Sequence, residues 1–202
     1  MVFIFAGLHI KADINKNYSQ IYFFKPLTVI AIILIAFLQE SEISQTYKCF
    51  ILTGLVFSLL GDIFLMLKNA QFTKGLLAFL VAHIFYILAL VSNFGFHSNF
   101  ITLIPVLLFF ILFIKIILPL TGTKKIYVII YSLVIMFLLW QAFSRMYVEP
   151  SSSSLFFGVG IILFTISDII LAYNKFVKKF KHSQLIILST YYIAQLCITI
   201  SV

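Results

Sequence analysis

Charged residues are scarce in this chain of 202 residues: Asp, Glu, Lys and Arg make up 10% of it, and 63% of it is hydrophobic. Soluble domains are about one quarter charged and about half apolar, so the shortage of charge excludes an ordinary soluble domain. Cysteine is scarce too. Cys49 and Cys197 are too few for a disulfide framework and lack the spacing of a metal-binding pair, so we interpret both as packing residues.

The common signatures of hydrolytic and nucleotide chemistry are also missing. The sequence has no G-x-S-x-G turn, no H-E-x-x-H motif, no Walker loop and no set of three histidines within an apolar stretch. A zinc site would have to combine His83, Asp62, Asp168 and His9, which is an unusual ligand set for zinc. The sequence therefore predicts no resident metal and no cofactor.

Long apolar stretches are what the sequence has instead. A helix needs about 20 apolar residues to cross a bilayer, and stretches of comparable length occupy residues 23–38, 50–67, 75–91, 101–120, 126–143, 155–173 and 185–200. Residues 1–10 predict one more helix, which is too short to cross in the ordinary way. We expect an all-α polytopic transmembrane bundle of eight helices, with residues 1–202 as a single integral membrane domain.

Lysines gather on one side of the predicted bundle. If the helices alternate in direction, that side receives Lys11, Lys16, Lys25, Lys68, Lys74, Lys124, Lys125, Lys175, Lys178, Lys179 and Lys181. The other side receives Lys48 and Arg145. This asymmetry predicts a multi-pass protein of the cell membrane with both termini outside the cytoplasm. The net charge of +8 therefore favours lipid head groups as partners, and we expect no nucleic-acid partner.

Two apolar segments resemble each other. At an offset of 106 residues, Gly54 corresponds to Gly160, Asp62 to Asp168, and Tyr86 to Tyr192. Four predicted helices separate the members of each pair, so the pattern predicts a parallel 4+4 duplication with its axis along the membrane normal. Chance similarity between apolar helices is the alternative.

Asp62 and Asp168 are the acidic residues that fall inside predicted helices. An ionised carboxylate near the bilayer centre costs at least about 2.5 to 3.5 kcal/mol. Asp62 lies six residues before Lys68, and Asp168 lies seven before Lys175, so each is about 9 to 10 Å inside the predicted cytoplasmic boundary. We interpret the two aspartates as functional residues that share a chamber. The alternative is that each forms a structural hydrogen bond to a neighbouring helix.

Other polar side chains are expected near this level. His83 lies deep in a predicted helix and could orient a water molecule, although a buried core histidine is the alternative. Tyr131 could line a cavity or belong to an interfacial tyrosine belt, and Lys25 could meet a phosphate or be an ordinary interfacial lysine. The last predicted helix carries a polar strip that consists of Ser189, Tyr191, Tyr192 and Gln195.

Several motifs resemble the YhhN-like membrane proteins, the family that includes the lysoplasmalogenases. The matching pieces are KPL (25–27), GLVFSLLGD (54–62), AHIFY (82–86), SDIILAYNKF (167–176) and YYIAQL (191–196). They follow the family's order, and the Ser-Asp block is the most specific of them. The short first apolar stretch departs from the family's longer first span.

The resemblance implies a membrane hydrolase that cleaves the vinyl ether bond of lysoplasmalogens. The products would be a fatty aldehyde and glycerophosphoethanolamine or glycerophosphocholine, so the expected partners are a lysophospholipid substrate and the bilayer. Asp62, Asp168 and His83 are then the candidate catalytic residues. The candidate substrate-binding residues are Lys25, Ser58, Tyr86, Tyr131, Ser167, Asn174, Tyr191, Tyr192 and Gln195.

A pair of carboxyl groups suits that reaction. Vinyl ethers hydrolyse through protonation at carbon, which needs one protonated acid and one carboxylate that stabilises positive charge or activates water, as in glycosidases. Either aspartate could be the acid. Two other functions remain open: a proton-coupled transporter that uses the intramembrane Asp and His residues, and a non-catalytic lipid-binding membrane protein.

Overall fold

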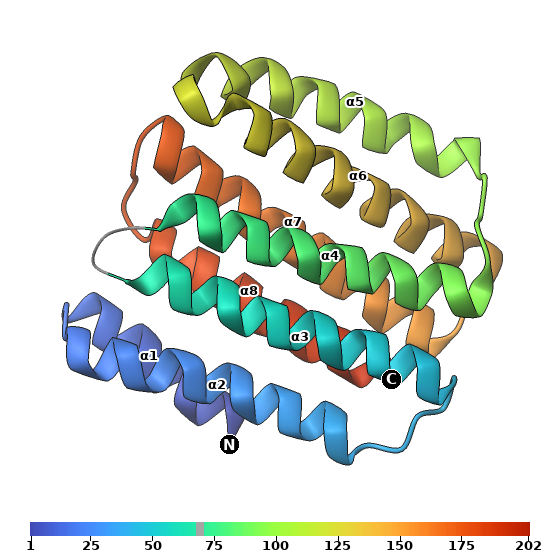
Figure 1. Ribbon diagram of the computed structural model, residues 1–202, viewed down its shortest axis with the longest axis horizontal. Helices are drawn as coiled ribbons and strands as arrows, with labels where there is room; N and C mark the ends of the chain where they lie inside the picture. The colour runs from blue at the N-terminus through green and yellow to red at the C-terminus, as the bar shows by residue number, and fades with distance from the viewer. Residues whose placement is uncertain (68–70) are drawn as a thin grey trace.

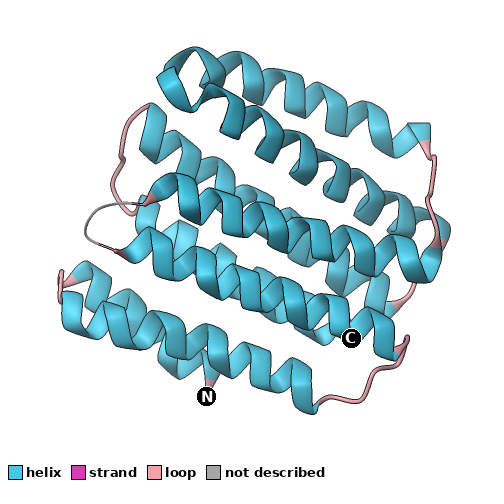
Figure 2. Cartoon of the chain, in the orientation of Figure 1, coloured by secondary structure: helices cyan, strands magenta, loops and turns pink. Residues whose placement is uncertain are grey.

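The computed structural model describes residues 1–67 and 71–202, and these residues form eight α-helices and no β-strand (Figure 2). The helices are α1 (Val2–Ile14), α2 (Tyr18–Leu38), α3 (Gln45–Met66), α4 (Phe72–Phe94), α5 (Phe100–Ile117), α6 (Lys125–Val148), α7 (Ser152–Phe176) and α8 (Ser183–Ile200). Two short 3-10 turns, η1 (Leu118–Leu120) and η2 (Gly122–Lys124), join α5 to α6. The predicted all-α class is confirmed.

Seven of the eight described helices, α2 to α8, are long and apolar enough to cross a membrane. The first helix, α1, has 13 residues and therefore a length of about 20 Å, which is short of the roughly 30 Å hydrocarbon core. In Figure 1 its first residue lies beside the middle of α2. The protein is an integral multi-pass membrane protein in which α1 is a partial helix, as the short apolar stretch predicted.

The helices alternate in direction, so their connections gather at two ends of the bundle (Figure 1). The α1–α2, α5–α6 and α7–α8 connections lie at one end, and they carry Lys16, Lys124 and Lys178. We call this the lysine-rich end. The α2–α3, α4–α5 and α6–α7 connections lie at the opposite end. This arrangement is the one that the lysine asymmetry of the sequence requires.

Polar caps start several helices earlier than the apolar stretches do. Asn17 accepts a hydrogen bond from the backbone of Gln20, so α2 begins at Tyr18. The apolar stretch predicted from residue 23 therefore starts too late, and Lys25 and Pro26 lie about two turns inside the helix. Lys25 is consequently carried into the bundle and is 8% exposed.

Glycines allow two helix pairs to pack closely. A Cβ atom at Gly61 of α3 would lie 2.7 Å from the ring of Phe79 in α4. A Cβ atom at Gly160 of α7 would lie 2.8 Å from the side chain of Ile198 in α8. No real side chain tolerates such distances, so glycine is what lets α3 approach α4 and α7 approach α8.

The packing of the first four helices recurs in the last four. Helix α3 packs mainly on α4, and α7 mainly on α8; likewise α1 packs on α2 and α5 on α6. The two halves meet through equivalent contacts, since α4 packs on α6 and α8 packs on α2. This correspondence is what a parallel 4+4 duplication predicts.

Candidate active site

A cavity of about 490 Å³ reaches into the bundle from the lysine-rich end, and both Asp62 and Asp168 line it. Its wall also includes Lys25 from α2, Ser167 from α7 and Tyr191 from α8. The two aspartates, which are 106 residues apart in the sequence, thus face a common chamber. Among the described residues, no hydrogen bond joins their carboxyl groups directly, because each carboxyl group is bound to other partners.

Asp62 is held by a cation and a hydroxyl group. The Nζ atom of Lys25 lies 3.0 Å from Oδ1 of Asp62, and the two side chains are 10% and 3% exposed. The hydroxyl of Tyr191 donates a hydrogen bond of 2.7 Å to Oδ2. Both carboxylate oxygens therefore have a donor, and the charge of Lys25 balances the buried negative charge.

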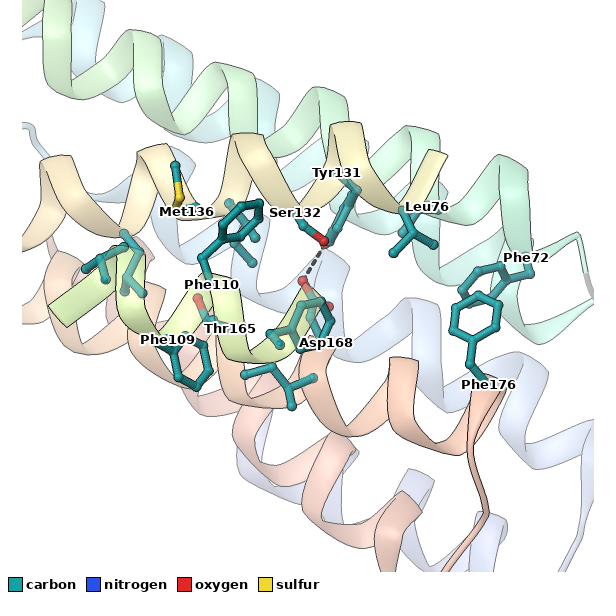
Figure 3. A pocket seen from close by; sticks show the side chains of 16 residues that line it. Phe72, Leu76, Phe109, Phe110, Tyr131, Ser132, Met136, Thr165, Asp168 and Phe176 are labelled. Carbon is teal, nitrogen blue, oxygen red and sulfur yellow. Dashed lines mark hydrogen bonds between the residues drawn. The ribbon is translucent and has the colours of Figure 1, made fainter. Parts of the chain in front are cut away.

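Asp168 has a different environment. Tyr131 of α6 donates a hydrogen bond to its Oδ2 atom, and the two side chains point toward each other across the gap between α6 and α7 (Figure 3). Within the described part of the chain, no lysine or arginine forms an ion pair with Asp168. Its surroundings include the apolar side chains of Leu76, Phe110 and Ile169. The two carboxyl groups are therefore chemically unlike.

The correspondence between the two halves of the sequence makes this difference easy to see. The offset of 106 residues that relates Asp62 to Asp168 also relates Lys25 to Tyr131. Each aspartate is thus bound by the residue at the same place on the second helix of its own half, but that residue is a cation in one half and a phenol in the other. Among the described residues, a lysine neutralises the carboxylate of the first half, and no cation pairs with that of the second.

His83 lies outside the cavity wall, in contrast to the role that the sequence suggested. Its ring packs against the rings of Phe164, Tyr131 and Tyr86, at centroid distances of 4.7, 5.4 and 6.3 Å. The side chain is fully buried, and neither ring nitrogen has a hydrogen-bond partner in the described structure. An aromatic wall therefore separates His83 from the chamber, so its placement favours a core histidine over one that orients water.

The other predicted substrate-binding residues divide into two groups. Lys25, Ser167, Asn174 and Tyr191 line the chamber. Ser58, Tyr86 and Gln195 form a separate buried network, in which the Tyr86 hydroxyl donates to Gln195 Oε1 at 3.1 Å and lies 3.4 Å from the Ser58 hydroxyl. This network holds α3, α4 and α8 together and lies behind the chamber wall.

Tyr192 contacts His9, a residue that little in the sequence marked as part of the site. Its hydroxyl lies 2.7 Å from Nδ1 of His9 in α1, and His9 lines the chamber. The available signal was a histidine within an otherwise apolar stretch. Because α1 is a short helix that packs on α2 and α8, only the folded structure brings His9 to the site.

The basic groups at the mouth of the chamber come from only some of the lysines at the lysine-rich end. Lys74 lies over the ring of Phe64 at 6.0 Å and is not among the lining residues, and Lys68 falls outside the described residues. Lys175 and Lys179 line the mouth instead, together with Asp13. Sequence reasoning counted both lysines as topology signals and Asp13 as a loop residue, because nothing in their local sequence marks them as ligands.

The described residues do not bring together three His, Cys, Asp or Glu side chains that could hold a metal ion. The ligand set considered from the sequence is divided: Asp62 is paired with Lys25, and His83 lies behind the aromatic wall.

Comparison with known proteins identifies the family. The sequence profile of the YhhN family matches residues 20–202, which cover seven of the eight helices and both aspartates. The chain belongs to the YhhN family. No solved structure shows a significant match to it.

Individual relatives carry enzyme names. The chain is 33% identical over 157 residues to lysoplasmalogenase TMEM86A from Bos taurus, an alignment that covers 75% of the chain and 64% of the relative. The human TMEM86A matches with the same identity and coverage. The human lysoplasmalogenase TMEM86B is 34% identical over 174 residues, covering 83% of the chain and 70% of the relative. The chain therefore spans less than two thirds of the length of the TMEM86A relatives.

Proposed function

We propose that this protein is a lysoplasmalogenase-type hydrolase that cleaves the vinyl ether bond of lysoplasmalogens to a fatty aldehyde and a glycerophospho-alcohol. The observation that carries the proposal is the shared chamber, in which Asp62 has a lysine counter-ion and Asp168 has none among the described residues. The names of the YhhN relatives support the hydrolase over the transporter and over a non-catalytic lipid-binding protein.

Asp168 is the general acid in this proposal. In a low-dielectric site without a counter-ion, a carboxyl group avoids the cost of buried charge by holding a proton. Tyr131 donates to Oδ2, which leaves Oδ1 to carry the proton. Transfer of that proton to the outer carbon of the C=C bond uses the π electrons for the new C–H bond and leaves an oxocarbenium ion.

Asp62 is the base. Its carboxylate remains ionised beside Lys25, so it stabilises the oxocarbenium ion and accepts a proton as water adds to the positive carbon. The hemiacetal that results breaks its bond to the glycerol oxygen as the hydroxyl group loses its proton and becomes the aldehyde carbonyl. Asp168 accepts that hydroxyl proton, and Asp62 gives the proton that it took from water to the glycerol oxygen. The sum is one water consumed, one aldehyde and one alcohol released, with both aspartates restored.

The head group fits the mouth of the chamber. Lys175 and Lys179 supply positive charge for the substrate phosphate, and Asp13 supplies a carboxylate for the amine of an ethanolamine or choline group. The lysine-rich end faces the cytoplasm by the positive-inside rule. The substrate would then approach from the cytoplasmic leaflet, with its phosphate at the interface.

Incubation of the purified protein in detergent with a lysoplasmalogen, followed by an assay for free aldehyde, tests the proposal. The saturated ether analogue with the same head group and chain is the matched control. We expect aldehyde from the vinyl ether and none from the saturated ether, because the saturated ether has no carbon that can be protonated. Failure to release aldehyde from any head-group variant would refute the proposal.

A further inference from the structure

A second, apolar cavity lies beside Asp168. Its volume is about 60 Å³, and aromatic and aliphatic side chains of α4, α5, α6 and α7 line it. Figure 3 shows Phe109, Phe110 and Met136 gathered along it, with the Tyr131–Asp168 hydrogen bond at its inner side. Apolar atoms contribute nearly all of its lining. We call this cavity the α5–α7 slot.

Asp168 marks the boundary between the slot and the chamber, since it lines both. A third small cavity, lined by Leu65, Phe79 and Asp168 among others, lies between them. The change from a charged wall to an apolar wall therefore occurs at Asp168. A lysoplasmalogen has the same change along its length, because its glycerophosphate head meets its aliphatic chain at the vinyl ether.

The slot reaches the lipid-facing surface of the bundle. Helix α5 lies at the edge of the molecule (Figure 1) and packs mainly on α6, with few contacts to α7. Phe109 of α5 lines the slot and is 45% exposed, whereas Val106, one turn earlier on the same helix, lines the slot and is 3% exposed. The slot therefore runs from Asp168 past Val106 to a lateral opening near Phe109.

We propose that the α5–α7 slot binds the first carbons of the alkenyl chain, with the remainder of the chain passing sideways into the bilayer. The inference rests on the proposed function and adds a substrate-binding site to it. A volume of about 60 Å³ holds only a few heavy atoms, so a whole fatty chain cannot fit. With the head group at Lys175 and Lys179, a chain that enters the slot carries its vinyl ether past Asp168.

Narrowing the slot tests this assignment. Val106→Trp fills the slot from α5, and Ser132→Phe fills it from α6, where Ser132 is 3% exposed. The matched control is Leu112→Trp, on the same helix as Val106 but facing lipid with 59% exposure. The measured quantity is the ratio of kcat/KM for a long-chain lysoplasmalogen to that for its 1-propenyl analogue, which has the same head group.

We expect Val106→Trp and Ser132→Phe to lower this ratio by about tenfold or more, because the longer chain alone must pass the added side chain. Leu112→Trp should leave the ratio unchanged. The proposal would be overturned if the ratio stayed unchanged in both slot variants while thermal unfolding showed that at least one of them is folded. Two variants on different helices guard against the loss of one to misfolding.

A second readout separates this inference from the proposed hydrolysis. A non-hydrolysable lysophospholipid ether with a photoreactive diazirine near the head-group end of its chain is cross-linked to the wild-type protein, and the labelled peptides are mapped. We expect labelling of the α5 and α7 peptides, reduced by Val106→Trp and retained in Leu112→Trp. Labelling confined to other helices would refute the slot, whether or not the protein releases aldehyde.

Discussion

Lys25 and Asp62 form an ion pair of 3.0 Å between α2 and α3, inside the part of the bundle that crosses the membrane. At the equivalent place in the second half, Asp168 accepts a hydrogen bond from Tyr131. The two halves thus keep both aspartates but give them unlike partners, a cation for Asp62 and a phenol for Asp168. An acid and a base in one chamber require such a difference.

Replacement of either aspartate should abolish catalysis. Asp168→Asn removes the proton that the mechanism places on carbon, and Asp62→Asn removes the base that activates water. We expect each to lower kcat by at least about 10² to 10⁴, measured as aldehyde release in detergent. The elution profile in size-exclusion chromatography serves as the folding control. Turnover at the wild-type rate in either variant would remove that residue from the mechanism.

The Lys25–Asp62 pair should be coupled in stability. Lys25→Met leaves a buried carboxylate without its counter-ion and should destabilise the fold by about 3 to 5 kcal/mol. Adding Asp62→Asn removes the unpaired charge, so the double variant should recover most of that loss while remaining inactive. The free energy of unfolding is measured in mixed detergents for the wild type, Lys25→Met, Asp62→Asn and the double variant. Equal loss in the single and double variants would show that the charge of Asp62 is not balanced by Lys25.

Tyr131 should act through Asp168. Tyr131→Phe removes the hydroxyl that donates to Oδ2, and we expect kcat to fall by about tenfold with little change in KM. The matched control is Tyr127→Phe on the same helix, since Tyr127 is 40% exposed and does not line the chamber. Equal kinetics in the two variants would mean that the hydrogen bond to Asp168 does not matter for turnover.

Asp13 should set the head-group preference in a pH-dependent way. Burial raises the pKa of Asp13 above its ordinary value, although nearby Lys25 and Lys179 lower it in part. Asp13 is a carboxylate above that pKa and is neutral below it. The preference of the enzyme for an amine-bearing head group over an amine-free phosphate head group should therefore weaken as the pH falls through the pKa of Asp13. Asp13→Asn should abolish both the preference and its pH dependence. Competition kinetics between the two substrates at several pH values provide the measurement, and a preference that survives in Asp13→Asn would contradict the assignment.

Much of the site was visible in the sequence because the membrane makes polar residues conspicuous. Asp62 and Asp168 were found as the acidic residues within apolar stretches, and their similar spacing from the following lysines, six and seven residues, predicted that they share a level. The same reasoning placed His83 near this level but could not indicate where its side chain faces, because depth along a helix carries no such information. The ring of Phe164 and its neighbours separate His83 from the chamber.

The partners of each aspartate could not be read from the sequence. Lys25 looked like an interfacial residue because its helix was expected to start beside it, but the Asn17 cap starts that helix earlier. Asp13 reaches the chamber from α1, Lys175 from the end of α7 and Lys179 from the α7–α8 connection. Such long-range neighbours follow from helix packing and leave no local pattern.

The sequence alone determined the helical membrane architecture, the gathering of the lysine-rich connections at one end of the bundle and the presence of two intramembrane carboxyl groups. Each of these depends on the energy of placing one side chain or one segment in hydrocarbon. Only the tertiary structure decided which carboxyl group receives a cation, which histidine meets the chamber and where an apolar slot opens beside Asp168. Those outcomes depend on which helix faces pack together, and glycines such as Gly61 and Gly160 fix that packing through contacts between residues far apart in the chain.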